Sequence, residues 1–164
     1  MFKFRTFSFL IILLLSKISF AQKVCLNLEN INKEVEIPQN VCLRSPEKFD
    51  QKYTLIEFFT TTCLTCKENL PILKDLHDLW KNKVSIKLVS LNPKKEMIEK
   101  FIEEYKDLLP YPIYFDPRRS AKKQFNIRLV PTLILFQNGV GLVFRHRGKM
   151  DEEVIKKLES FFES

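Results

Sequence analysis

Two cysteines separated by two residues, Cys63 and Cys66, have the spacing in this chain that most directly indicates chemistry. They lie in the stretch TTTCLTCKENLP, residues 60–71. Such a pair can form a structural disulfide, bind a metal ion or exchange electrons with a substrate. A structural disulfide is disfavoured because the short loop that it would close restrains little chain entropy. A structural zinc site usually needs four ligands in two close pairs. The other cysteines and histidines are isolated from the pair: Cys25, Cys42, His77 and His146. The spacing therefore favours a redox pair and no metal site.

Cys63 is the expected nucleophile because it follows an apolar stretch typical of a buried strand and opens an amphipathic stretch typical of a helix. A sulfur at a helix N-terminus lies beside unpaired N–H groups and the positive end of the helix dipole. Both features favour the thiolate and lower the pKa of Cys63. Cys66 lies one helical turn further on, more buried, and would resolve the mixed disulfide that Cys63 forms with a substrate.

A base is needed for that second step, because a buried thiol resists ionisation. Glu57 is the candidate, as the charged residue within the otherwise apolar stretch LIEFF just before the cysteine pair. A buried acid is costly unless it has a partner or a function. The alternative is that Glu57 points to solvent from a strand edge.

Hydrophobic patterning predicts the elements that position these residues. Apolar β-branched and aromatic stretches predict strands, and apolar residues at helical spacing predict helices. The predicted strands cover residues 52–60, 84–92, 111–115, 132–136 and 141–147, and the predicted helices cover 63–82, 94–105, 118–125 and the chain from 151 onward. An edge hairpin is predicted from 24–28 and 33–37, and a short helical turn at 45–47. Alternating strands and helices predict an α/β sandwich with a mixed central sheet.

The N-terminus predicts export. Basic residues precede the apolar run 7–15, and a small-x-small cleavage site ends at Ala21. Lys17 ends the run well short of the roughly 20 apolar residues that a spanning helix needs. We therefore predict a signal peptide over 1–21 and one domain over 22–164, in the periplasm or envelope of a bacterium. The alternative is an N-terminal anchor that stays attached.

Charge and composition exclude few functions. The chain has 27 Lys and Arg and 20 Asp and Glu residues, which gives a net charge of +7. Lysines and glutamates are interleaved as on solvated helix faces, and no basic stripe with stacking aromatics is present. Nucleic-acid binding is therefore not expected.

Cys25 and Cys42 bracket the predicted N-terminal hairpin. Export would place them in an oxidising compartment, where disulfides persist, so they are a candidate structural disulfide. The alternatives are two free thiols, or a second redox pair that relays electrons to Cys63 and Cys66.

The stretch LIEFFTTTCLTCKENLP resembles the active-site block of the thioredoxin superfamily: a strand, the CxxC pair, a lysine and a helix proline. Glu57 falls where thioredoxins carry their buried acid, six residues before the first cysteine. FNIRLVPTLILFQNGV resembles the second family signature, with Pro131 at the cis-proline and Val130 before it. Gly148 matches a family glycine. With the helix and strand inserted before the second signature, residues 24–162 are similar to exported thioredoxin-like proteins of the TlpA/ResA type.

The resemblance implies a thioredoxin-like three-layer sandwich in which the cis-proline loop lies against the CxxC pair. The Val130 backbone would pair with the substrate, beside Pro131 and the intervening Leu64 and Thr65. The chain departs from the family pattern at three places: Thr62 replaces a tryptophan, Leu64-Thr65 replaces a pair that contains proline, and Asn69 replaces a glutamate common in the TlpA/ResA group. These departures concern the substrate and the redox potential more than the chemistry.

The expected function is reduction of disulfides in exported proteins, with apocytochrome c, and hence cytochrome c maturation, as one example. Leu64 and Thr65 supply no charge that would strongly stabilise the Cys63 thiolate, which disfavours a strong oxidant. We expect no cofactor besides the redox-active disulfide, a membrane electron donor as partner, and a monomer. The alternatives are a disulfide-forming oxidase, a copper-binding or metallochaperone protein on the same fold, and a substrate-binding module.

Overall fold

A six-stranded mixed sheet in the order β2-β6-β5-β4-β7-β8 organises the chain. The computed structural model describes residues 25–27, 29–30, 40–42 and 51–164. The strands are β1 (Cys25–Asn27), β2 (Glu29–Asn30), β3 (Asn40–Cys42), β4 (Tyr53–Phe59), β5 (Val84–Ser90), β6 (Ile113–Phe115), β7 (Thr132–Gln137) and β8 (Gly141–Arg147). The helices are α1 (Leu64–Trp80), α2 (Lys95–Tyr105), the 3-10 turn η2 (Lys106–Leu108), α3 (Ser120–Gln124) and α4 (Glu152–Glu163).

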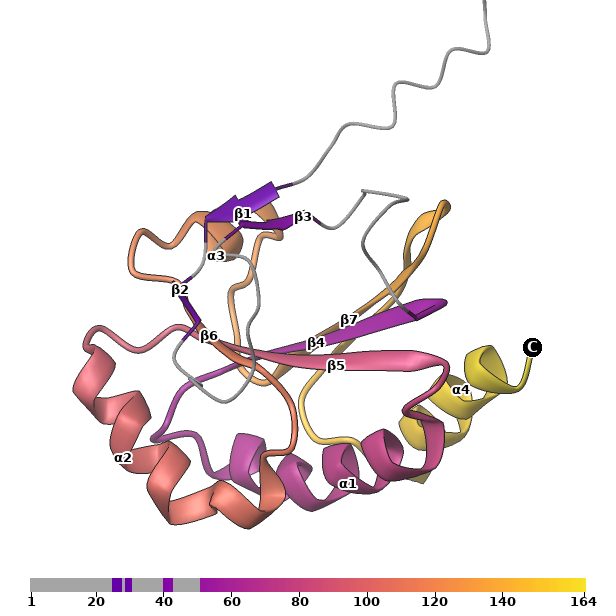
Figure 1. The fold of residues 1–164 in the computed structure, drawn as a ribbon, viewed down its shortest axis with the longest axis horizontal. Coiled ribbons are helices and arrows are strands. Elements are labelled where there is room, and N and C mark those ends of the chain that lie inside the picture. Colours follow the sequence, from indigo (N-terminus) through magenta and orange to yellow (C-terminus); the bar gives the residue numbers. More distant parts are fainter. Residues whose placement is uncertain (1–24, 28, 31–39, 43–50) are drawn as a thin grey trace, which may run out of the picture.

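Strand β4 lies at the centre of the sheet. It pairs in parallel with β5 on one side and antiparallel with β7 on the other. Helices α1, α2 and α4 cover one face, whereas α3 and the β1–β3 ribbon lie on the opposite face (Figure 1). All seven residues of β4 are buried, because both faces are covered. The expected α/β sandwich with a mixed sheet is confirmed.

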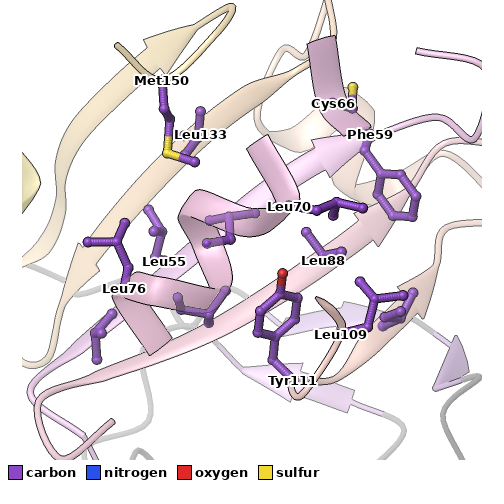
Figure 2. Packing of buried hydrophobic residues seen from close by; sticks show 14 of the residues in the cluster. Leu55, Phe59, Cys66, Leu70, Leu76, Leu88, Leu109, Tyr111, Leu133 and Met150 are labelled. Carbon is purple, nitrogen blue, oxygen red and sulfur yellow. The ribbon is translucent and has the colours of Figure 1, made fainter. Parts of the chain in front are cut away.

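Helix α1 is anchored to the sheet by its apolar face. Leu70, Leu73 and Leu76 are buried against leucines of β4, β5 and β7, as Figure 2 shows for the labelled side chains. Burying one such leucine contributes roughly 1.5–3 kcal/mol to the free energy of folding, so this contact holds α1 against the sheet. Pro71 lies inside α1 on its exposed side. A second apolar cluster under α3 packs Phe125 against Phe58 and Phe136.

The elements predicted from residue 52 onward are all present, with ends that differ by at most two residues. The N-terminal hairpin is only partly as predicted. Strand β1 matches the predicted strand 24–28, but β3 at residues 40–42 pairs with it antiparallel. The predicted partner 33–37, the helical turn 45–47 and the signal peptide 1–21 lie outside the described residues. Strand β2, which pairs with β6, was not predicted.

None of the helices within residues 51–164 is long and apolar enough to span a bilayer.

Candidate active site

Cys63 and Cys66 form a disulfide at the N-terminus of α1. Cys63 is the residue that caps the helix: its backbone is extended, and its Sγ accepts a hydrogen bond from the Cys66 N–H at 3.2 Å. Cys63 is half-buried, whereas Cys66 is only 1 % exposed. The predicted asymmetry of the pair is thus confirmed. An accessible sulfur faces the helix N–H groups, and a buried sulfur lies one turn behind it.

The loop that carries Cys63 is held by Asn92, two residues after the end of β5. The Thr61 N–H donates to Asn92 Oδ1 at 3.0 Å, and Asn92 Nδ2 donates to Thr61 Oγ1 at 2.8 Å. Ser90 Oγ also donates to Asn92 Oδ1, at 2.8 Å. Sequence analysis missed this clamp. Its signal was a polar residue at the end of the predicted strand 84–92, at the sheet end where Cys63 begins its helix.

Glu57 is fully buried in β4, so the alternative of a solvent-facing strand edge is wrong. Its Oε2 accepts a hydrogen bond from Asn69 Nδ2 at 2.9 Å, and its Oε1 has no partner among the described residues. Burial raises the pKa of Glu57 to about 8, although the Asn69 hydrogen bond acts in the opposite direction. A pKa near the working pH is what a side chain that both accepts and returns a proton needs.

Asn69 connects Glu57 to a distant loop. Its Oδ1 accepts a hydrogen bond from the Met150 N–H at 3.0 Å. Because a backbone N–H can only donate, the amide orientation is fixed and Nδ2 must face Glu57. Asn69 lies three residues after Cys66, on the same helix face. Glu57 therefore lies under α1, bonded to the side chain one helical turn after Cys66.

Sequence analysis noted Asn69 only as a departure from the family pattern. The signal for its role was its helical spacing from Cys66, which directs it toward the strand that carries Glu57. Tyr111 was also missed as a neighbour of the acid. Its hydroxyl is buried without a described partner, and burial and then the charge of Glu57 raise its pKa, so it stays protonated.

Val130 and Pro131 are joined by a cis peptide bond. Because Thr132 lies opposite Phe58, this bond lies beside the carboxyl end of β4, at the sheet end where Cys63 begins its helix. The Gly148 N–H, directly after β8, donates to the Pro131 carbonyl at 2.9 Å. The structure thus brings the two sequence signatures to one end of the sheet.

Two leucines expose apolar surface next to the cysteine pair and the cis-proline. Leu64, between the cysteines, is 74 % exposed, and Leu129, just before the cis bond, is 65 % exposed. Thr65 and Val130 are half-buried. Leu129 was not predicted as a site residue; its signal was an apolar side chain beside the predicted cis-proline.

The histidines lie apart from the disulfide. The His77 ring lies edge-on to Tyr111 at 5.8 Å, and burial lowers the pKa of His77. A ring nitrogen of His146 lies 2.9 Å from the Lys149 carbonyl oxygen. Within the described part of the chain, no three His, Cys, Asp or Glu side chains gather as they would around a metal ion.

Cys25 and Cys42 lie directly opposite each other in the register of β1 and β3. The backbone arrangement thus brings the two positions together, and a disulfide between them stays a prediction.

A CxxC disulfide at a helix N-terminus, a cis-proline beside it and a mixed sheet between helices together define a thioredoxin-like protein. A family model described as thioredoxin-like matches residues 50–141, more than half of the chain. The chain belongs to the thioredoxin-like family.

Two curated relatives are similar in sequence. The thiol-disulfide oxidoreductase ResA of Halalkalibacterium halodurans is 26% identical over 111 residues, 67% of this chain and 62% of that protein. The sporulation thiol-disulfide oxidoreductase A of Bacillus subtilis is 28% identical over 109 residues, 63% of this chain and 64% of that protein. The matches thus span less than two thirds of either relative.

Solved structures show the same fold. StoA from Bacillus subtilis superposes with a TM-score of 0.66 at 22% identity, covering 87% of this chain and 98% of that one. A thiol-disulfide isomerase from Corynebacterium glutamicum gives a TM-score of 0.70 at 20% identity, covering 87% and 96%. At these identities the likeness establishes the fold alone.

Proposed function

We propose that this protein is a thiol-disulfide oxidoreductase that reduces disulfides in exported proteins. One observation carries the proposal: Cys63 caps α1, and the buried Glu57 is hydrogen-bonded to Asn69, the residue one helical turn after the buried Cys66. An accessible nucleophile, a buried resolving thiol and a nearby acid–base group are the parts that two-step disulfide exchange needs. The names of the two curated relatives support the same reaction class.

The reaction begins with the reduced protein. The Cys63 thiolate attacks one sulfur of the substrate disulfide, which forms a mixed disulfide and releases one substrate thiolate. The Cys66 thiol then gives its proton to Glu57 and attacks the Cys63 sulfur. The Cys63–Cys66 disulfide forms, and the second substrate thiolate leaves. Two electrons pass from protein to substrate, and two protons convert the released thiolates to thiols.

Three residues are proposed to position the substrate beside Cys63. Val130 offers its backbone next to Pro131 at the same sheet end, and Leu64 is the exposed residue between the cysteines. An extended substrate could pair with Val130 while its apolar side chain contacts Leu64.

The reductase direction is supported by the residues between the cysteines. Leu64 and Thr65 bring no charge to the Cys63 thiolate, and a thiolate without extra stabilisation leaves the dithiol a ready electron donor. A membrane electron donor would return the two electrons, and apocytochrome c is one candidate substrate. Export is supported by the signal-like residues 1–21.

The test is the reduction potential of Cys63–Cys66, measured against a dithiothreitol series. We expect a value near the roughly −270 mV of thioredoxin. A value near roughly −120 mV would make the protein a disulfide-forming oxidase and overturn the proposed direction.

Two controls belong to this measurement. Alkylation read by mass reports Cys25 and Cys42 in the same samples: a structural disulfide stays oxidised throughout, and a second redox pair titrates with the first. Replacing Cys63 by Ser should abolish electron transfer. If disulfide reduction continued in that variant, Cys63 would not be the nucleophile.

A further inference from the structure

Positive charge is concentrated in residues 117–150, the stretch that contains the cis-proline. This stretch holds eight of the 27 Lys and Arg residues of the chain and none of its 20 Asp and Glu residues. The rest of the chain therefore has 19 basic and 20 acidic residues, so the whole positive surplus comes from this stretch. The basic residues are dispersed along it and form no continuous run.

Most of these cations have no carboxylate partner among residues 51–164. Among residues 51–164, the ion pairs include one member of this stretch, Lys149, which lies 3.0 Å from Glu68. Asp116, just before the stretch, accepts hydrogen bonds from the N–H groups of Ser120 and Lys122 and so caps α3. The positive charge of the other seven is thus not balanced by any ion pair among residues 51–164.

The fold places two of the arginines on the same sheet face as α3. Arg145 lies opposite Ile134 and Arg147 opposite Thr132 in the β7–β8 register. Ile134 belongs to the apolar cluster under α3, and side chains along a strand alternate between faces. Arg145 Nη2 accordingly donates to the Phe125 carbonyl at the end of α3, at 2.9 Å.

Three more basic residues lie around α3. Arg119, Lys122 and Lys123 line an open pocket of about 400 Å³ together with Asn126 and Ile127. The described residues of this lining include three cations and no carboxylate. A concave surface of one charge sign concentrates its field and attracts groups of opposite charge.

Two arginines border the cis-proline segment itself. Arg128 precedes Pro131 by three residues, so their Cα atoms lie within roughly 11 Å. Its Nε donates to Asn126 Oδ1 at 3.2 Å, and Asn126 adopts a left-handed conformation with φ of 49°. Arg147 lies opposite Thr132, the residue after Pro131, and the Cα atoms of Arg147 and Thr132 are about 5 Å apart. The proposed substrate-binding segment is thus flanked by positive charge.

We propose that this basic face selects substrate proteins whose disulfide is flanked by acidic residues. The basic face consists of Arg119, Lys122, Lys123, Arg128, Arg145 and Arg147. Leu129 would contact an apolar residue beside the substrate cysteine, and nearby carboxylates would pair with Arg128 and Arg147. A longer acidic segment would reach the pocket at α3.

An acidic polypeptide fits this face better than an anionic membrane does. The arginines border the segment that would hold a substrate, so the charge lies where it can act on a partner during disulfide exchange. The inference rests on the proposed function and specifies its substrate class.

The test uses the reduced protein and two synthetic peptides, each with one intramolecular disulfide. The peptides are identical except that Asp and Glu beside the cysteines in one are Asn and Gln in the other. The second-order rate constant of each reduction is divided by that of the same peptide with dithiothreitol, which removes differences in intrinsic reactivity. We expect the acidic peptide to react about tenfold faster at low ionic strength. The advantage should shrink at about 0.5 M salt, because charges are then screened within a few ångströms.

Two variants locate the effect. In the double variant Arg128→Gln/Arg147→Gln, the ratio of acidic to neutral rate constants should fall toward one. The matched control is Lys100→Gln, an exposed lysine on α2, which covers the opposite face of the sheet (Figure 1). In this control the ratio should stay as in the parent protein.

Three results would overturn the inference. Equal normalised rate constants for both peptides would show that the face does not select acidic substrates. An unchanged ratio in the double variant, with loss of binding to phosphatidylglycerol vesicles, would assign the arginines to a membrane surface instead. If neither peptide were reduced, the proposed function itself would fail, and this inference with it.

Discussion

Replacing Glu57 by Gln should stabilise the oxidised protein increasingly as the pH rises. Burial raises the pKa of Glu57 from the ordinary value of 4.5 to about 8. Between these values the native carboxyl stays protonated while the carboxyl of the unfolded chain ionises, which favours unfolding. The native protein therefore loses stability as the pH rises from 4.5 to about 8, and the loss then levels off. At about 1.4 kcal/mol per pH unit, it totals on the order of 5 kcal/mol.

Glutamine should lack this penalty and keep the contacts. Its Oε1 can accept the hydrogen bond that Asn69 Nδ2 gives to Glu57, so the link from Asn69 to Met150 is preserved. Near pH 4.5 and below, the two proteins should differ in free energy of unfolding by no more than about 1 kcal/mol, because both then carry a neutral side chain.

The assay is urea unfolding of the disulfide form, in which neither Cys63 nor Cys66 titrates. Glu104→Gln, which removes an exposed carboxylate on α2, should change stability by less than about 0.5 kcal/mol at every pH. A stability difference between Glu57→Gln and the parent that stayed constant from about pH 4.5 to about pH 9 would refute the reasoning. It would mean that the carboxyl is ionised in the core and that burial does not raise its pKa.

Three further predictions concern the groups around Glu57 and Cys63. In Glu57→Gln, resolution of the mixed disulfide should slow, and its rate should lack the inflection near pH 8 that we expect rapid-quench alkylation to show for the parent. An unchanged profile would remove Glu57 from the proton transfer. Asn69→Leu should lower the free energy of unfolding by about 2–4 kcal/mol, because the Met150 N–H and the carboxyl both lose a buried partner; urea unfolding at pH 6 that gave less than about 1 kcal/mol would contradict this role. Asn92→Ala should lower the free energy of unfolding by about 1–3 kcal/mol, because the Thr61 loop loses its hydrogen bonds to Asn92. Alkylation of reduced Cys63 by iodoacetamide should then show a broader distribution of rates. Unchanged stability and alkylation would show that these hydrogen bonds are dispensable.

Sequence alone was sufficient for the features encoded locally. The switch from an apolar stretch to helical spacing at Cys63 predicted a helix N-terminus, and the structure has Cys63 as the cap. It was not sufficient for the burial of Glu57, because alternation along one strand does not say whether both faces are covered. That is decided by β5 and β7, which flank β4, and by the layers above and below the sheet.

The missed hydrogen bonds of Asn69 and Asn92 depend on contacts between distant residues. Asn69 and Met150 are 81 residues apart, and Asn92 and Thr61 are 31 apart, so no local pattern pairs them. The observed partner of β1 also lies further along the chain than the predicted one: β1 pairs with residues 40–42, and the predicted stretch 33–37 lies outside the described residues.

The hydrogen bonds of the segment 148–150 have a practical consequence for engineering. The Gly148 N–H donates to the Pro131 carbonyl, and the Met150 N–H donates to Asn69 Oδ1. These three consecutive residues thus connect the cis-proline segment to helix α1. An epitope tag or fluorophore inserted there would pull those parts out of alignment. The turn between β7 and β8 offers a safer position, because it lies at the other end of β7 and Val140 is 63 % exposed. Exposed turn tips generally tolerate insertions. A tag in this turn would leave the site free for substrate.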